Sequence, residues 1–169
     1  MRCTNVVLPV ALAALVAGCG LSPSARLEAN KTLVRQFTET VNAADWARLE
    51  DLVADDVVRH SQATAGPPVT SRAAFVELQQ AFLLSMPDQR VTIQLLVAEG
   101  DKVAALATYT GTQTGPMGDF PITGKAVDAP FLAIFRIADT KIAELWVEWD
   151  NLAMLTQLGL FPPPSPTGG

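Results

Sequence analysis

Residues 143–159, AELWVEWDNLAMLTQLG, decide which fold the chain can adopt. The first half of this stretch alternates between two sets of side chains, as a β-strand does: Glu144, Trp146, Glu148 and Asp150 on one face, and Leu145, Val147 and Trp149 on the other. From Asn151 to Leu158 the residues favour a short helix, and Gly159 ends it because glycine is common just beyond helix C-termini. The stretch therefore predicts a strand that runs directly into a helix.

The residues before this strand predict the rest of a sheet. Glu99-Gly100-Asp101-Lys102 is a hairpin turn signal, and a loop rich in glycine and proline covers residues 114–124. A second turn is expected at Asp139-Thr140. The predicted strands, in a long antiparallel meander, cover residues 90–98, 103–113, 125–137 and 141–150.

Helices are predicted in the N-terminal half. Apolar residues at helical spacing indicate an amphipathic helix over 25–43, and Asp45 can cap a second, shorter helix through Val53. A short strand at 57–60 follows, and Thr70 or Ser71 can cap a third helix that stops before Pro87. The expected class is α+β, with three N-terminal helices on one side of a curved antiparallel sheet and a short C-terminal helix.

Length and charge limit the classes of partner. The 169 residues suit one folded domain, and the formal net charge is −5, with 12 Lys and Arg against 17 Asp and Glu. Binding to nucleic acid needs a basic face, and the sequence contains no Lys/Arg cluster. We therefore expect no nucleic-acid partner.

The N-terminus is typical of an export signal. Arg2 gives a small positive region, and the apolar run Val6 to Ala17 is shorter than the roughly 20 residues of a membrane-spanning helix. The run ends in Val16-Ala17-Gly18-Cys19, which resembles the bacterial lipobox, where the cysteine is acylated after cleavage. An ordinary signal peptide with a chance cysteine, or a buried N-terminal strand, is the alternative. The first interpretation predicts a protein of the bacterial cell envelope, lipid-anchored to a membrane through Cys19.

This interpretation divides the chain into four parts. The signal peptide takes residues 1–18, a tether 19–25, the domain 26–160 and a disordered tail rich in proline and glycine 161–169. Cleavage also removes Cys3 and leaves only the acylated cysteine, so neither a disulfide nor a catalytic thiol is expected. With one histidine in the chain, we expect no metal site.

Three motifs span most of residues 30–160. They are Asn42-x-x-Asp45-Trp46-x-x-Leu49 with Val58-x-His60, Gly111-Thr112-x-Thr114-Gly115-Pro116 with Pro121-x-Thr123-Gly124-Lys125-x-Val127, and Glu144-x-Trp146-x-x-x-Asp150-x-Leu152-x-x-x-x-Gln157-Leu158-Gly159. In this order the motifs resemble those of the SnoaL-like polyketide cyclase (ester cyclase) family, which has the nuclear-transport-factor-2-like cone fold.

The resemblance implies a cone-shaped α+β barrel with a pocket between helices and sheet, usually without a cofactor. The best-known members of the family close a polyketide ring by intramolecular aldol condensation, in which an aspartate shuttles the proton. The resemblance places that aspartate at Asp150. Two features depart from the family pattern: Ala153 stands where the family often has glycine, and His60 is the only histidine.

Asp150 has two interpretations. If the face with Glu144, Trp146 and Glu148 lines a pocket, crowded carboxylates would keep one proton to higher pH, which suits removal of a proton next to a carbonyl. The alternative leaves both glutamates in solvent and makes Asp150 the cap of the helix that starts at Asn151.

The other candidates are His60 and the aromatic residues. His60 could orient a ligand or act as an acid, although a lone histidine is more commonly structural. Tyr109 could donate to a developing enolate, and strand tyrosines also commonly serve packing. The candidate pocket residues are Trp146, Glu148, Tyr109, Phe75, Phe82 and Phe131, and core packing is the alternative role of the phenylalanines.

Both faces of the strand from Phe131 to Ile137 are mostly apolar, which indicates that both are covered. Helices cover one face, and a second copy of the chain is the simplest cover for the other, so a homodimer is expected.

Three functions remain open from the sequence. The first is a cofactor-free cyclase or isomerase acting on an apolar carbonyl compound, with Asp150 as acid/base and His60 assisting. The second is a lipid-anchored module that binds an apolar small molecule in the same pocket without catalysis. The third is a structural lipoprotein that binds a partner through its sheet surface.

Overall fold

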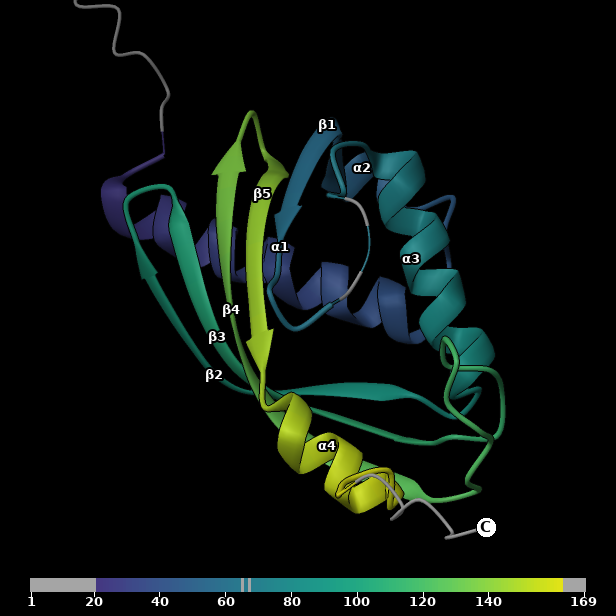
Figure 1. Ribbon diagram of the computed structural model, residues 1–169. Helices are drawn as coiled ribbons and strands as arrows, with labels where there is room; N and C mark the ends of the chain where they lie inside the picture. Colours follow the sequence, from purple (N-terminus) through teal and green to yellow (C-terminus); the bar gives the residue numbers. More distant parts are fainter. Residues whose placement is uncertain (1–20, 65, 67, 163–169) are drawn as a thin grey trace, which may run out of the picture.

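A five-stranded, strongly curved sheet is the frame of the molecule (Figure 1). The computed structural model describes residues 21–64, 66 and 68–162. The strands lie in the order β1-β5-β4-β3-β2. Their bounds are β1 Val53–His60, β2 Arg90–Glu99, β3 Lys102–Thr112, β4 Ala126–Ala138 and β5 Lys141–Trp149. β2 to β5 form the predicted antiparallel meander.

The short strand predicted at 57–60 begins earlier, at Val53, and pairs in parallel with β5. A parallel neighbour needs a long crossover connection, and the chain between His60 and Lys141 provides one. The α+β class is therefore confirmed, and β1 adds one parallel pairing to the antiparallel sheet that the sequence predicted.

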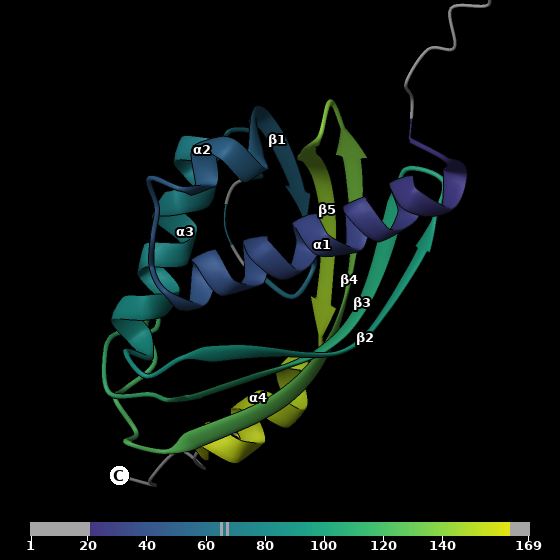
Figure 2. The ribbon, with the colours of Figure 1, turned by 180° about the vertical axis from the view of Figure 1, so that it is seen from behind.

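Four helices are described: α1 Pro23–Asn42, α2 Leu49–Leu52, α3 Arg72–Ser85 and α4 Asn151–Leu158. α1 and α3 lie over the concave face of the sheet, and α4 lies at its lower end (Figures 1 and 2). α1 begins within the stretch assigned to the tether, because the Ser22 side chain accepts a hydrogen bond from the amide of Ala25. α2 is shorter than expected, since Asp45 caps the turn before it by accepting from the amide of Arg48.

The main core joins α1, α3 and the concave face. Phe37 of α1 lies 5.8 Å from Phe75 of α3 and 5.7 Å from Phe135 of β4, measured between ring centres. Asn42, at the end of α1, exchanges two hydrogen bonds of 2.8 Å with the backbone of Val91 in β2. These contacts fix α1 across the sheet at both its middle and its end.

A buried glutamine holds the loop between β3 and β4. Gln113 is fully buried, donates to the carbonyls of Gly115 and Pro121, and accepts from the amide and hydroxyl of Thr123. Gly115 packs so closely against α3 that an added Cβ would clash with the carbonyl oxygen of Leu84. The loop is therefore fastened to the end of α3.

None of the described helices is long and apolar enough to cross a membrane. The predicted signal peptide, the lipidation site Cys19 and most of the predicted tail lie outside the described residues.

Candidate ligand-binding site

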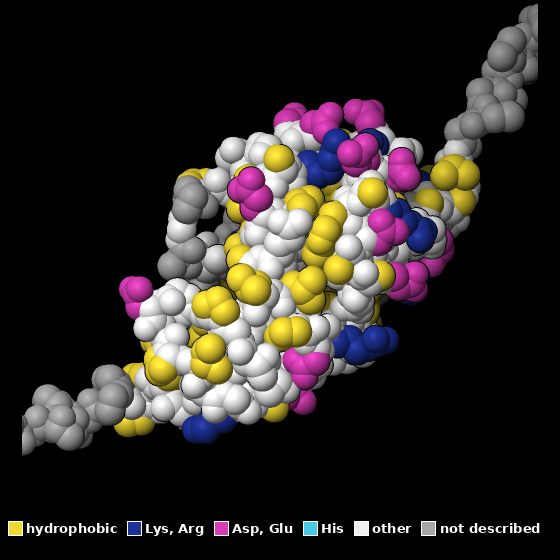
Figure 3. Space-filling view, turned by 90° about the vertical axis from the view of Figure 1, so that its right-hand side faces the viewer, with side chains coloured by type: hydrophobic (Ala, Val, Ile, Leu, Met, Phe, Trp, Pro, Cys, Tyr) yellow, Lys and Arg dark blue, Asp and Glu magenta, His cyan; other side chains and the backbone are white. Residues whose placement is uncertain are grey.

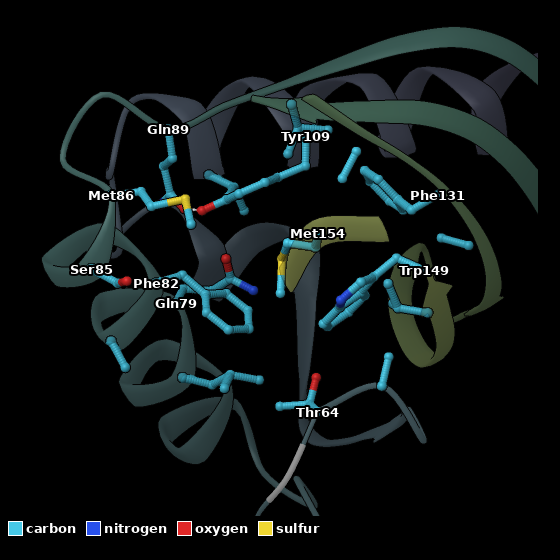
Figure 4. A pocket seen from close by; sticks show the side chains of 18 of the residues that line it. Thr64, Gln79, Phe82, Ser85, Met86, Gln89, Tyr109, Phe131, Trp149 and Met154 are labelled. Atoms are coloured by element: carbon cyan, nitrogen blue, oxygen red, sulfur yellow. Dashed lines mark hydrogen bonds between the residues drawn. The ribbon is translucent and has the colours of Figure 1, made fainter. Parts of the chain in front are cut away.

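A cavity of about 660 Å³ lies between the concave face of the sheet and the helices (Figure 4). Most of its wall is apolar. Four of the predicted pocket residues, Tyr109, Phe75, Phe82 and Phe131, line it. Met117 and Phe120 of the loop after β3 and Met154 of α4 also line it, so elements from both halves of the chain enclose one space.

α4 is held in place by the Gln157 side chain. This amide donates to the carbonyl of Asp128 in β4 at 3.0 Å and accepts from the amide of the same residue at 2.8 Å. Leu158 is buried beside it, and Gly159 takes the left-handed conformation, with φ of 71°, that ends the helix. The Gln157-Leu158-Gly159 motif therefore fastens α4 to the sheet and keeps Met154 in the cavity wall.

One side of the cavity carries a group of polar side chains. The Tyr109 hydroxyl donates to Oε1 of Gln89 at 2.9 Å (Figure 4). Burial, together with the charge of Asp88, raises the pKa of Tyr109 far above its ordinary value, so the hydroxyl stays protonated and can donate. Nε2 of Gln89 and Oγ of Ser85 are buried without a hydrogen-bond partner among the described residues. Buried polar atoms of this kind suit an oxygen acceptor of a ligand.

A second polar group comes from β1. Arg59 lines the cavity and is only 7% exposed, and its Nη2 donates to Oγ1 of Thr64 at 3.0 Å. Its guanidinium carbon lies 5.9 Å from the ring centre of Trp149. Burial lowers the pKa of Arg59, but an arginine keeps its charge in proteins.

Four predicted site residues do not line this cavity: Asp150, His60, Trp146 and Glu148. The alternation predicted for β5 is present, but the face that looks into the cavity carries Leu145, Val147 and Trp149. The expectation that the acidic face lines the pocket is wrong. That face lies on the outer, convex side of the sheet, where its carboxylates keep their hydration.

Asp150 caps α4. Its Oδ1 accepts from the amide of Ala153 at 3.0 Å, and its side chain is exposed. The capping interpretation is the one that the geometry supports, because the carboxylate satisfies a free amide of the first helical turn.

His60 belongs to a charged cluster on the convex side. Its Nε2 lies 2.8 Å from Oε1 of Glu144, whose Oε2 accepts from Nε of Arg136 at 2.8 Å. Hydrogen bonds from Arg136 and His60 lower the pKa of Glu144. The His60 ring also stacks on Trp146, with ring centres 5.1 Å apart. Strand alternation explains this placement, since His60 points away from the cavity while its neighbour Arg59 points into it.

Arg59 is the one ionic side chain among the described residues that line the cavity. Among the residues that the structure describes, no Asp, Glu or His lines the cavity. Within the same ranges, no three His, Cys, Asp or Glu side chains gather as metal ligands would. The arrangement can bind an apolar molecule and donate hydrogen bonds to it at two places.

With this geometry established, the comparison with known proteins identifies the family. The family model for SnoaL-like polyketide cyclases matches residues 31–158. The chain belongs to the SnoaL-like polyketide cyclase family. Its fold is the nuclear-transport-factor-2-like cone fold of that family.

Solved structures agree with the chain over nearly their whole length. IdmH from Streptomyces antibioticus, a proposed polyketide cyclase, is 31% identical, with 78% of this chain and 99% of that one covered and a TM-score of 0.69. AclR from Streptomyces galilaeus, a proposed hydroxylase, is 26% identical, with 80% of this chain and 99% of AclR covered and a TM-score of 0.70. A SnoaL-like protein from Jannaschia sp. CCS1 shares the fold at 22% identity, with 86% of this chain and 100% of that one covered and a TM-score of 0.73. No curated protein that was compared matches the chain significantly.

Sequence reasoning missed Arg59, Gln89, Ser85 and Val147 as cavity residues. A signal for Arg59 was present, because Val57 and Arg59 share one face of a strand whose other face carries Val58 and His60. Ser85 and Gln89 gave no such signal, since Ser85 lies at the end of α3 and Gln89 lies between α3 and β2.

The capping role of Asp150 predicts that two variants at this position differ in their free energy of unfolding. Asp150→Ala removes the acceptor for the Ala153 amide, so the free energy of unfolding should fall by about 1 kcal/mol. Asp150→Asn should stay close to the original stability, because asparagine caps helices as well as aspartate does. Urea denaturation measures both, and equal losses in the two variants would contradict the capping role.

Proposed function

We propose that this protein binds an apolar small molecule in the cavity between the sheet and its helices. The observation that carries the proposal is the make-up of the wall: aromatic and aliphatic side chains, with a few hydrogen-bond donors at two places. Sites for small molecules are usually concave and mostly apolar, with a few polar groups that set the orientation, and a volume of about 660 Å³ lies within their usual range.

Cyclase-type chemistry on an apolar carbonyl compound is the second candidate. Membership of the family favours it, as does the 31% identity to IdmH. In that case Tyr109 and Arg59, which line the cavity, would touch the substrate, and the exposed Asp150 would not. A protein that only binds would return its ligand unchanged, so product analysis after incubation separates the two candidates.

Filling the cavity should weaken binding. Val147 projects from β5 into the cavity, and Val147→Phe adds a ring there. The variant should therefore bind the neutral fluorescent probe N-phenyl-1-naphthylamine with an affinity lower by at least about tenfold. Fluorescence titration measures the affinity. Glu148→Gln, at the neighbouring position on the opposite face, is the matched control and should bind like the original chain. Equal binding by both variants would mean that the probe does not use this cavity.

We also propose that the convex face of the sheet joins two copies of the chain. Two rows of paired residues cross this face: Val97, Ala104, Ile134 and Trp146 in one, and Leu95, Leu106, Leu132 and Glu148 in the other. Five of these side chains are exposed by 39 to 62%: Leu95, Val97, Leu106, Leu132 and Ile134. A patch of this kind is typical of an interface, and a twofold axis would place it against its own copy.

The side of the molecule that carries α3 differs from the convex face. Figure 3 shows the side that carries α3, where hydrophobic side chains are spread over the middle, Asp and Glu gather along the upper edge, and Lys and Arg are scattered. This face therefore presents no basic patch.

The dimer has a direct test. Leu132→Glu places a charge in the centre of the patch, so sedimentation equilibrium of residues 20–169 should show a dimer for the original residue and a monomer for the variant. Thr92→Glu, on an exposed strand position outside the two rows, is the control and should remain dimeric. A monomer at every concentration with Leu132 in place would contradict the proposal.

We further propose that Cys19 carries lipid and holds the domain to a membrane of the bacterial cell envelope. The sequence of residues 1–19 supports this, and α1 begins only four residues after Cys19. Two or three acyl chains would anchor the protein stably. Cys19→Ser should abolish incorporation of radioactive palmitate and move the protein from the membrane pellet to the soluble fraction. Labelling that persists in the variant would contradict this site.

A further inference from the structure

Arg59 is a charged side chain in a mostly apolar cavity. The backbone of β1 leaves it no other direction, because its amide donates to the carbonyl of Val69 at 2.9 Å and its partner in the parallel register is Leu145. The side chains of Val58 and His60 take the outer face. Arginine is rarely buried unless it is paired, so the contacts of its guanidinium group are informative.

The contacts of Arg59 leave its charge without an ion pair. Among the described residues, Nη2 donates to Oγ1 of Thr64, and no carboxylate oxygen lies within 4.0 Å. Glu148 acts on Arg59 only through space, and its own Oε1 accepts from the amide of Gln62 at 2.9 Å. The Trp149 ring near the guanidinium stabilises a cation but does not neutralise it.

We propose that Arg59 binds an acidic group of the ligand, so that the natural ligand is an apolar small molecule that carries one carboxylate or an equally acidic oxygen. This inference rests on the proposed function and names the chemical class of the ligand. The guanidinium group offers several donors in a planar fork that matches a carboxylate. The apolar wall strengthens the pairing because it excludes water.

The opposite side of the cavity adds a second polar contact. Thr64 and Trp149 lie across the cavity from Gln89 (Figure 4). Nε2 of Gln89 and Oγ of Ser85 are unpartnered among the described residues and can donate to a neutral acceptor such as a carbonyl. The ligand therefore has its acid at the Arg59 side, an apolar body, and an acceptor at the Gln89 side.

A matched pair of probes tests the role of Arg59. N-phenyl-1-naphthylamine is neutral, and 8-anilinonaphthalene-1-sulfonate is the same molecule with one sulfonate. Arg59→Gln should lower the affinity for the sulfonate probe by at least about tenfold, which is about 1.4 kcal/mol of binding free energy. The same variant should change the affinity for the neutral probe by less than about twofold. Arg90→Gln, which removes the same charge from an exposed position at the start of β2, should change neither affinity.

Each outcome separates the inference from the proposed function. If the neutral probe binds and Arg59→Gln weakens both probes equally or neither, the acidic-ligand inference is wrong and the binding function stands. If neither probe binds the original chain, the proposed function fails as well. If Arg59→Gln does not fold, Arg59→Lys provides the test, because lysine keeps the positive charge but lacks the planar guanidinium fork. Arg59→Lys should lower the affinity for the sulfonate probe alone. Equal effects on the affinities for both probes would overturn the inference.

Discussion

The two-residue period of β5 is the constraint on which the site depends. Hydrogen bonding to β4 on one side and β1 on the other fixes the strand, so its side chains cannot exchange faces without breaking two ladders. The part of the cavity wall that β5 supplies therefore consists of Leu145, Val147 and Trp149. Glu144, Glu148 and the cap residue Asp150 stay outside it, and the chemistry available inside follows from that division.

The same period in β1 explains why Arg59 places its charge inside the cavity. Arg59 and His60 are neighbours in the sequence, and their side chains go to opposite faces of one sheet. The imidazole completes an ion cluster with Glu144 and Arg136, while the guanidinium enters the apolar space. The cavity of this chain thus presents hydrogen-bond donors and a positive charge, while Glu144, Glu148 and Asp150 lie outside it.

Much of the fold could be predicted from the sequence, because helix caps, turns and alternation act locally. The Ser71 cap, the turn at Asp139-Thr140 and the change from strand to helix at Asn151 lie where their residues indicate. The sequence left the cavity-facing side of β5 between two interpretations, since both of its faces contain a tryptophan and only the covering helices decide between them. Gln113 was missed for a related reason, as its partners come together only when the loop folds over α3.

Methyl chemical shifts test most directly which face of β5 meets a ligand. With the valine and leucine methyl groups labelled, titration with N-phenyl-1-naphthylamine should shift the resonances of Val147, which faces the cavity, and leave those of Leu132 on the convex face unchanged. Shifts at Leu132 without shifts at Val147 would contradict ligand binding in the cavity, because the bound molecule would then lie on the outside of the sheet.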